Sequence, residues 1–261
     1  MKALLRADLY RLFRSKFFYI LLIVSFALAL ITFLLYLAIY EISEGEDGLM
    51  PFVMTAEQLQ MLSFDGTIGY MAAIAAAIFV CGDYSGGGMR NKVVIGCGRR
   101  KIFYSKLIAV SFASVCIYIA IQIVVFVLGG GAFGWEGASA YHVISRFIAG
   151  LFMSLAYAAI FTSVALLAQK LSSSLIFGIV VIFAVTMIVS LLSVAASMLD
   201  SAAFDWIYKI FARLTPMGQN SLLMAGEDDY WVLTAISAAW VLLAVFAVPV
   251  WFKNRDMICC G

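Results

Sequence analysis

Six runs of predominantly apolar residues are the feature that most constrains this chain. They lie at about residues 17–40, 64–81, 107–128, 147–168, 174–199 and 230–252. A helix of about 20 such residues crosses the ~30 Å hydrocarbon core of a bilayer. The whole sequence is 12% charged and 65% hydrophobic, whereas a soluble domain is about a quarter charged. We therefore expect an all-α integral membrane protein of one domain, residues 1–261, with six transmembrane helices in a lipid bilayer.

Charged residues divide between the two sides of these runs. The two terminal segments and the loops after the second and fourth runs hold 14 of the 17 Lys and Arg residues. The remaining loops hold 12 of the 15 Asp and Glu residues. Because Lys and Arg accumulate in cytoplasmic loops, the pattern predicts that both termini face the cytoplasm.

Residues 1–16 repeat apolar side chains at helical spacing, with basic residues between them. The apolar positions are Leu5, Leu9, Leu12 and Phe13. This pattern is typical of an amphipathic helix that lies in the headgroup layer. The alternative is that these residues are only the polar beginning of the first transmembrane helix.

Residues 82–106, between the second and third runs, form the most basic loop and contain two groups of glycines. Gly86–Gly88 disfavour a helix, the residues Met89–Ile95 can form a short one, and Gly96 and Gly98 can end it. We therefore expect a short helix inside this loop. The alternative is a solvated loop that is basic only because it is cytoplasmic.

Two further segments have helical patterns. Thr186, Ser190, Ser193 and Ser197 fall on one face of the fifth run. These hydroxyls either line a polar route or bond to their own helix or a neighbour. Apolar residues also recur at helical spacing within residues 200–229, which predicts an interfacial or re-entrant helix that ends near Pro216. Residues 129–145 are rich in glycine and read as an outer loop.

No enzymatic motif is present. The chain lacks G-x-x-x-x-G-K-[ST], so it has no P-loop for ATP. His142 is the only histidine, and it has no companion ligands or bases in the pattern of a metal site or a catalytic triad. We expect neither catalysis, a metal nor a cofactor on this chain, and no nucleic-acid partner. The lack of charged residues at mid-membrane depth weighs against a secondary transporter or a channel.

The order of these segments resembles a known family. A basic amphipathic opening, RADLYRLFRSKFFY, leads into the first span, and DYSGGGMRNKVVIGCGRRKIFYSKLI follows the second. This order resembles the permease subunits of ABC-2-type exporters, including the short six-span permeases of bacterial peptide and lantibiotic-immunity exporters. The GGG run departs from the commoner pattern of a single small residue followed by Gly and Thr.

The resemblance implies a division of labour. Residues 1–16 would be the elbow helix, and the loop after the second span would contain a coupling helix that docks on a separate ABC ATPase, which binds ATP and Mg. Within that loop, apolar anchors and polar residues suit such a contact; the residues concerned are Met89, Arg90, Asn91, Lys92, Val93, Val94 and Ile95.

The function expected from the resemblance is export across the bacterial cytoplasmic membrane. Two permease copies, identical or paralogous, would move amphipathic or hydrophobic cargo by alternating access. Peptides such as toxins, bacteriocins or lantibiotics are the expected cargo, with self-immunity as one purpose. Small lipophilic drugs and sodium remain alternatives within this class. A secondary transporter or channel, and a membrane scaffold or sensor, are alternatives outside it.

Overall fold

The computed structural model describes residues 2–45, 55–199 and 202–253, and every regular element in these ranges is a helix. Within these described ranges, six helices are long and apolar enough to cross a bilayer. They are α2 (Lys16–Gly45), the continuous helix α4–η1–α5 (Thr67–Ala76, Ala77–Cys81, Gly82–Ser85), α7 (Arg99–Ile123) with its extension, α9 (Ala140–Ala168), α10 (Leu171–Leu199) and α13 (Tyr230–Lys253). The predicted all-α membrane fold is therefore confirmed.

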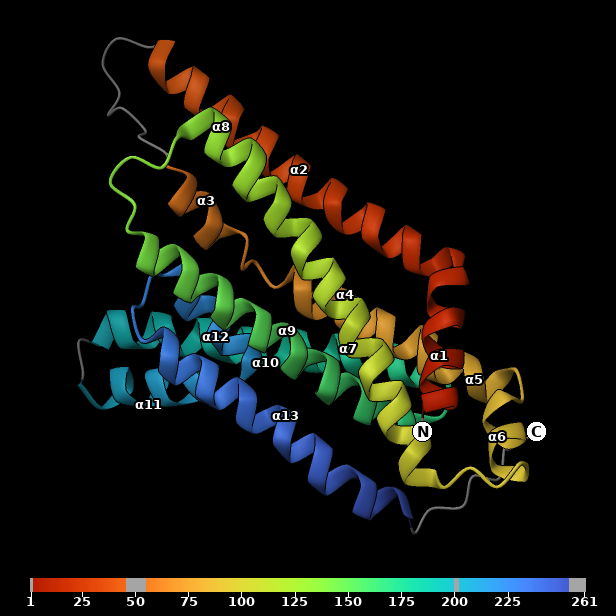
Figure 1. The fold of residues 1–261 in the computed structure, drawn as a ribbon. Helices are drawn as coiled ribbons and strands as arrows, with labels where there is room; N and C mark the ends of the chain where they lie inside the picture. Colours follow the sequence, from red (N-terminus) through yellow and green to blue (C-terminus); the bar gives the residue numbers. More distant parts are fainter. Residues whose placement is uncertain (1, 46–54, 200–201, 254–261) are drawn as a thin grey trace.

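Three of the long helices form the centre of the bundle (Figure 1). The α4, α7 and α9 helices bury half or more of their apolar stretches, whereas α2, α10 and α13 bury only 17%. The α9 helix packs against α7, α13 and α4. Small side chains on α4, among them Ala72, Ala75 and Ala76, are buried and allow this close packing. The outer three helices leave most of their apolar surface to surroundings outside this chain.

Short helices occupy the two ends of the bundle (Figure 1). The α1 helix (Lys2–Arg14) and α6 (Gly88–Val94) lie together at the end that carries most of the Lys and Arg residues, which we call the basic end. At the opposite, acidic end lie α3 (Ala56–Leu62), α11 (Ala202–Leu214) and α12 (Pro216–Met224). The short helix expected within Met89–Ile95 is thus present as α6.

The glycine-rich loop expected at residues 129–145 is largely helical. The third long helix continues through η2 (Val124–Gly129) and α8 (Gly130–Phe133), and α9 already begins at Ala140. These glycines allow close packing: a Cβ on Gly129 would lie 2.6 Å from the Leu59 side chain, and one on Gly130 would lie 2.4 Å from the Trp135 indole nitrogen. The prediction that residues 129–145 form a loop rested on glycine content alone, and it was wrong for most of these residues.

Two other boundaries differ from the expectations. The α7 helix begins at Arg99, so residues 99–106 belong to the third long helix instead of the loop. The fifth long helix begins at Leu171, after a turn in which Gln169 has a φ of 59°. The helix expected to end near Pro216 is present as α11, which ends at Leu214. Pro216 then begins a further helix, α12, because proline suits the first helical turn and Thr215 caps it by accepting a hydrogen bond from the Gly218 N–H.

The α3 helix was not expected within the acidic loop. Thr55 and Gln58 form a reciprocal capping box: the Thr55 hydroxyl accepts from the Gln58 N–H, and the Gln58 side chain accepts from the Thr55 N–H. A threonine followed three residues later by glutamine is the sequence signature of this cap.

Candidate functional site

Glycines set the limits of α6, the short helix at the basic end. Gly87 precedes it with a φ of 69°, and Gly96 follows it with a φ of 87°. Side chains other than glycine rarely adopt these angles. The α6 helix is therefore a separate rigid segment between two sharp changes of chain direction.

The outward face of α6 combines apolar and polar side chains. Val94 and Ile95 are 78% and 80% exposed, and Arg90 and Asn91 are also exposed. Exposed apolar side chains beside a basic group, beyond the ends of the membrane-spanning stretches, mark a surface suited to a protein partner.

Two of the predicted anchor residues face inward instead. Met89 is 1% exposed and belongs to the hydrophobic core, and Val93 is partly buried against the same core. The α6 helix must attach to its own bundle through one face, and Met89 and Val93 lie on that face. Met89 is therefore unsuited to the partner contact that the sequence suggested for it. Lys92, also predicted to face a partner, is directed into the chain by an ion-pair network.

This network, which we call the buried charge cluster, joins α6 to the bundle. It consists of Asp8 and Arg11 of α1, Asp83 of α5, Lys92 of α6 and Lys106 of α7. The side chains of Asp8, Asp83 and Lys106 are 2%, 1% and 4% exposed. Buried charges are costly unless they are paired and hydrogen-bonded, and each carboxylate in the cluster has three donors.

Lys92 and Lys106 each bridge the two carboxylates. Lys92 Nζ lies 2.7 Å from Asp8 Oδ1 and 2.9 Å from Asp83 Oδ2. Lys106 Nζ lies 3.2 Å from Asp8 Oδ1 and 2.5 Å from Asp83 Oδ2. The Ser105 hydroxyl donates to Asp8 Oδ2 at 2.6 Å, and Arg11 donates to Asp83 Oδ1. Four helices, α1, α5, α6 and α7, are thus held together at one point.

The ionisation of the cluster follows from this pairing. Burial by itself raises the pKa of Asp8, but the charge of Lys106 and the hydrogen bonds from Lys92 and Ser105 outweigh it and hold that pKa below its ordinary value. Burial likewise lowers the pKa of Lys92, and the hydrogen bonds to Asp8 and Asp83 outweigh it, so the net shift is upward. Both groups are therefore charged at neutral pH.

The cluster also contacts an irregular part of the second long helix. Lys106 Nζ donates to the carbonyl oxygen of Phe79 at 3.3 Å, and Phe79 lies in the π-helical stretch η1. A π-helical turn is less regular than an α-helix and is often found at functional sites. A cavity of about 210 Å³, lined in part by Asp8, Arg11, Asp83 and Lys106, lies beside the cluster.

A second set of contacts joins this segment to α9. The Tyr84 hydroxyl donates to the Leu166 carbonyl at 3.3 Å, and the Cys81 thiol lies 3.6 Å from the Ala165 carbonyl oxygen. The end of the second long helix is thus tied to α9 by these contacts, and to α1, α6 and α7 by the buried charge cluster.

Sequence reasoning missed the buried charge cluster as a unit. The signal lay in the spacing of Leu5, Asp8 and Leu12, which puts the carboxylate on the inward face of α1. Leu12 is 1% exposed, Leu5 and Leu9 are partly buried, and Phe13 is 44% exposed. The helix expected at residues 1–16 is present as α1, and its position in a headgroup layer stays a prediction.

The hydroxyl stripe of α10 bonds to its own helix. Thr186, Ser190, Ser193 and Ser197 donate to carbonyls three or four residues earlier, at 2.8–2.9 Å. Thr186, Ser190 and Ser197 are exposed and Ser193 is partly buried. The stripe therefore lies on the outer surface of this single chain, and its role in a transport route stays a prediction.

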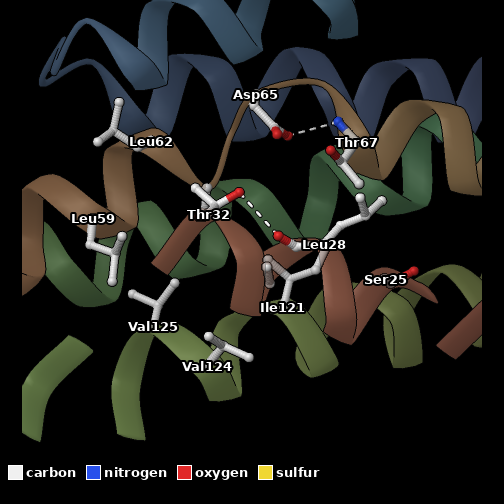
Figure 2. A pocket seen from close by; sticks show the side chains of 12 residues that line it. Ser25, Leu28, Thr32, Leu59, Leu62, Asp65, Thr67, Ile121, Val124 and Val125 are labelled. Carbon is white, nitrogen blue, oxygen red and sulfur yellow. Dashed lines mark hydrogen bonds between the residues drawn. The ribbon is translucent and has the colours of Figure 1, made fainter. Parts of the chain in front are cut away.

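A pocket toward the acidic end lies between α2, α3, α4 and α7. Figure 2 shows its apolar lining and the hydroxyl groups at its rim, with the Thr32 hydroxyl bonded to the Leu28 carbonyl and Asp65 accepting from the Thr67 N–H. Its volume is about 30 Å³. A cavity of this size has room for about two water molecules and not for a larger ligand.

The model of the family described as ABC-2 family transporter protein matches residues 4–189. The chain belongs to the ABC-2 family. The match extends from α1 through most of α10 and includes α6 and the buried charge cluster. No curated protein matches the chain.

Members of the ABC-2 family are the membrane subunits of ABC transporters. This chain is accordingly a multi-pass ABC transporter permease, and the family implies an ABC ATPase as its partner. The permease itself is not the catalytic subunit.

Proposed function

We propose that this ABC-2 permease is the membrane subunit of an exporter and that α6 is the coupling helix on which a separate ATPase docks. The observation that carries the proposal is the division of α6 into two faces. Arg90, Asn91, Val94 and Ile95 are exposed to a partner, while Met89 and Lys92 attach the helix to the bundle.

The exposed face suits a groove with an apolar floor and an acidic rim. Val94 and Ile95 would supply the apolar contact, and Arg90 would pair with a carboxylate of the ATPase. ATP and Mg would be held by the ATPase, since the permease sequence has no P-loop.

The buried charge cluster would transmit the motion of the ATPase. Its charges hold α6 to α1 and α7 more firmly than apolar contact alone, because separating a buried ion pair leaves unpaired charges in a low-dielectric region. ATP-driven displacement of α6 would then move whole helices and switch the permease between inward-facing and outward-facing states. The basic end would face the cytoplasm of a bacterial cell, in line with its Lys and Arg content.

The complex would contain two permease copies. The α2 and α10 helices bury only 17% of their apolar stretches within one chain, which leaves wide faces for a second copy and for lipid. Amphipathic peptides, including toxins, bacteriocins or lantibiotics, are the proposed cargo, because helices this apolar suit cargo that partitions into lipid.

Affinity purification in several mild detergents tests the proposed partner. We expect a P-loop ATPase to copurify in about equal amount with the permease, and its ATP hydrolysis to depend on that association. Copurification of the permease without any ATPase under all these conditions would contradict the proposal.

Reconstitution of the complex into vesicles tests the cargo. ATP hydrolysis should rise with amphipathic peptides and stay at its basal rate with sodium or small lipophilic drugs. Stimulation by sodium or drugs alone would contradict the peptide assignment and leave the docking of the ATPase intact.

A further inference from the structure

The cavity beside the buried charge cluster lies where the membrane-spanning stretches end. Its volume is about 210 Å³, and its walls come from the turn between α1 and α2, the end of the second long helix and the first turns of α7. The apolar stretch of α2 begins at Lys16, and that of the second long helix ends at Ser85. In a bilayer the polar headgroups of the lipids lie at this level. The cavity is therefore within reach of a lipid headgroup.

The buried charge cluster carries an excess positive charge. Its three cations, Arg11, Lys92 and Lys106, face two carboxylates, Asp8 and Asp83. Among the residues that the structure describes, no third carboxylate pairs with these cations. A charge without a counterion is costly where water is partly excluded. An anion in the cavity would balance it.

Arg11 is the group that a ligand in this cavity can reach. Its side chain is 56% exposed and lines the cavity. A guanidinium has five N–H donors, and within the described ranges Asp83 is the only partner of Arg11. The remaining donors suit the oxygens of a phosphate, which the planar guanidinium binds in pairs. The carboxylate oxygens of Asp8 and Asp83 already accept from their own donors, so they offer less to a cationic ligand.

The other side of the cavity is apolar. Its lining residues there are Leu12, Phe17, Ile78, Phe79 and Ala109. Phe17 is 57% exposed and belongs to α2, which buries only 17% of its apolar stretch within this chain. The cavity thus adjoins a surface that hydrocarbon can cover. A soluble anion gains nothing from these side chains, whereas a lipid can lay an acyl chain on them.

We infer that the cavity binds the headgroup of an anionic phospholipid, with the phosphate paired to Arg11 and an acyl chain on Phe17 and Ile78. Basic pockets at helix ends bind anionic headgroups in this way. A zwitterionic lipid fits less well, because its ammonium group adds positive charge where positive charge is already in excess. The site belongs to the permease alone, so it stands or falls independently of the ATPase.

Native mass spectrometry of the full-length permease, released from detergent micelles, counts bound lipids directly. The two probes are phosphatidylglycerol, which is anionic, and phosphatidylcholine with the same acyl chains. We expect one molecule of phosphatidylglycerol to bind at least about tenfold more tightly than phosphatidylcholine. Equal affinities would overturn the inference.

Inorganic phosphate distinguishes a lipid site from a site for a soluble anion. Added in large excess over the lipid, it should leave phosphatidylglycerol bound, because it makes no contact with the apolar side. Displacement of the lipid by inorganic phosphate would overturn the assignment to lipid.

Two matched variants separate the site from the general charge of α1. Arg11→Gln removes the guanidinium from the cavity, and Arg6→Gln removes the same charge from an exposed position of α1 outside the cavity and the cluster. The preference for phosphatidylglycerol should disappear in Arg11→Gln and persist in Arg6→Gln. Equal losses in the two variants would show only the attraction of a basic helix for anionic lipid and would overturn the inference.

A third variant tests the cavity without touching the cluster. Ala109→Met narrows the apolar side and keeps every charge, so it should weaken the binding of phosphatidylglycerol. This test holds even if Arg11→Gln unfolds the protein, which the melting temperature shows. Wild-type affinity of folded Ala109→Met for phosphatidylglycerol would place the lipid outside the cavity and overturn the inference.

Discussion

Lys106 Nζ lies 2.5 Å from Asp83 Oδ2, and the two side chains are 4% and 1% exposed. Asp83 lies in the last turn of the second long helix, in α5, and Lys106 belongs to the third. This contact attaches the α5–α6 segment to α7 of the bundle. Because Lys92 of α6 bonds to the same Asp83 oxygen at 2.9 Å, α6 cannot shift relative to α7 without disturbing this contact.

Removal of one partner from this pair should destabilise the protein strongly. Asp83→Asn leaves Lys92, Lys106 and Arg11 facing a single carboxylate, and loss of one partner of a buried ion pair costs about 3–5 kcal/mol. The second change Lys106→Met removes the excess charge, so the double variant should be more stable than additivity predicts by at least about 1 kcal/mol. Unfolding in lipid nanodiscs measures all three variants. Strictly additive losses would show that the two residues act separately.

Stability should depend on pH only outside the neutral range. The pKa of Asp8 is lowered, so its stabilising contribution is present above about pH 4, its ordinary range, and is lost as the pH falls through the folded-state value. The pKa of Lys92 is raised, so its contribution is present below about pH 10 and is lost as the pH rises through the folded-state value. The difference in melting temperature between wild type and Asp8→Asn should be constant from about pH 5 to about pH 9 and shrink in acid. A difference that varies between about pH 6 and about pH 8 would contradict this assignment of charges.

The packing of the central helices can be tested with two glycines. A Cβ on Gly150 of α9 would lie 2.6 Å from the Phe64 ring and from the Tyr118 hydroxyl, whereas one on Gly131 of α8 would meet nothing within 4 Å. Gly150→Ala should destabilise the protein by about 1–3 kcal/mol through overpacking. Gly131→Ala should be neutral or slightly stabilising, because alanine is the better helix former. Equal stability of the two variants would contradict the close packing of α9 on Phe64 and on Tyr118 of α7.

The sequence predicted the helical membrane fold because apolar runs and charge asymmetry are local properties of a chain. It also predicted α6, because glycine readily adopts the positive φ angles found at both limits of this helix, at Gly87 and Gly96. Gly129 and Gly130 were wrongly assigned to a loop. Glycine is needed at these positions because the side chains of Leu59 and Trp135 lie against them, which the local sequence does not show. Composition cannot distinguish a flexible glycine from one that makes room.

The two faces of α6 were harder to predict for the same kind of reason. Periodicity shows that Met89 and Val93 share a face, but not whether that face meets a partner or the chain's own core. The buried charge cluster shows most clearly which contacts the sequence pattern does not predict. Asp8, Asp83 and Lys106 each look like ordinary charges near a membrane boundary, and only the fold brings the two carboxylates within 3.2 Å of Lys106 Nζ.

The central claim is that the exposed face of α6 binds the ATPase. Val94→Asp combined with Ile95→Asp puts two charges into the proposed contact at positions that are 78% and 80% exposed, so the permease should fold normally. Ser173→Asp, an exposed position near the turn between α9 and α10 at the same end, is the matched control. The direct measurement is the amount of ATPase that copurifies with each permease variant. We expect at least a tenfold loss for the α6 variant and none for the control, and wild-type copurification by a folded α6 variant would contradict docking of the ATPase on α6.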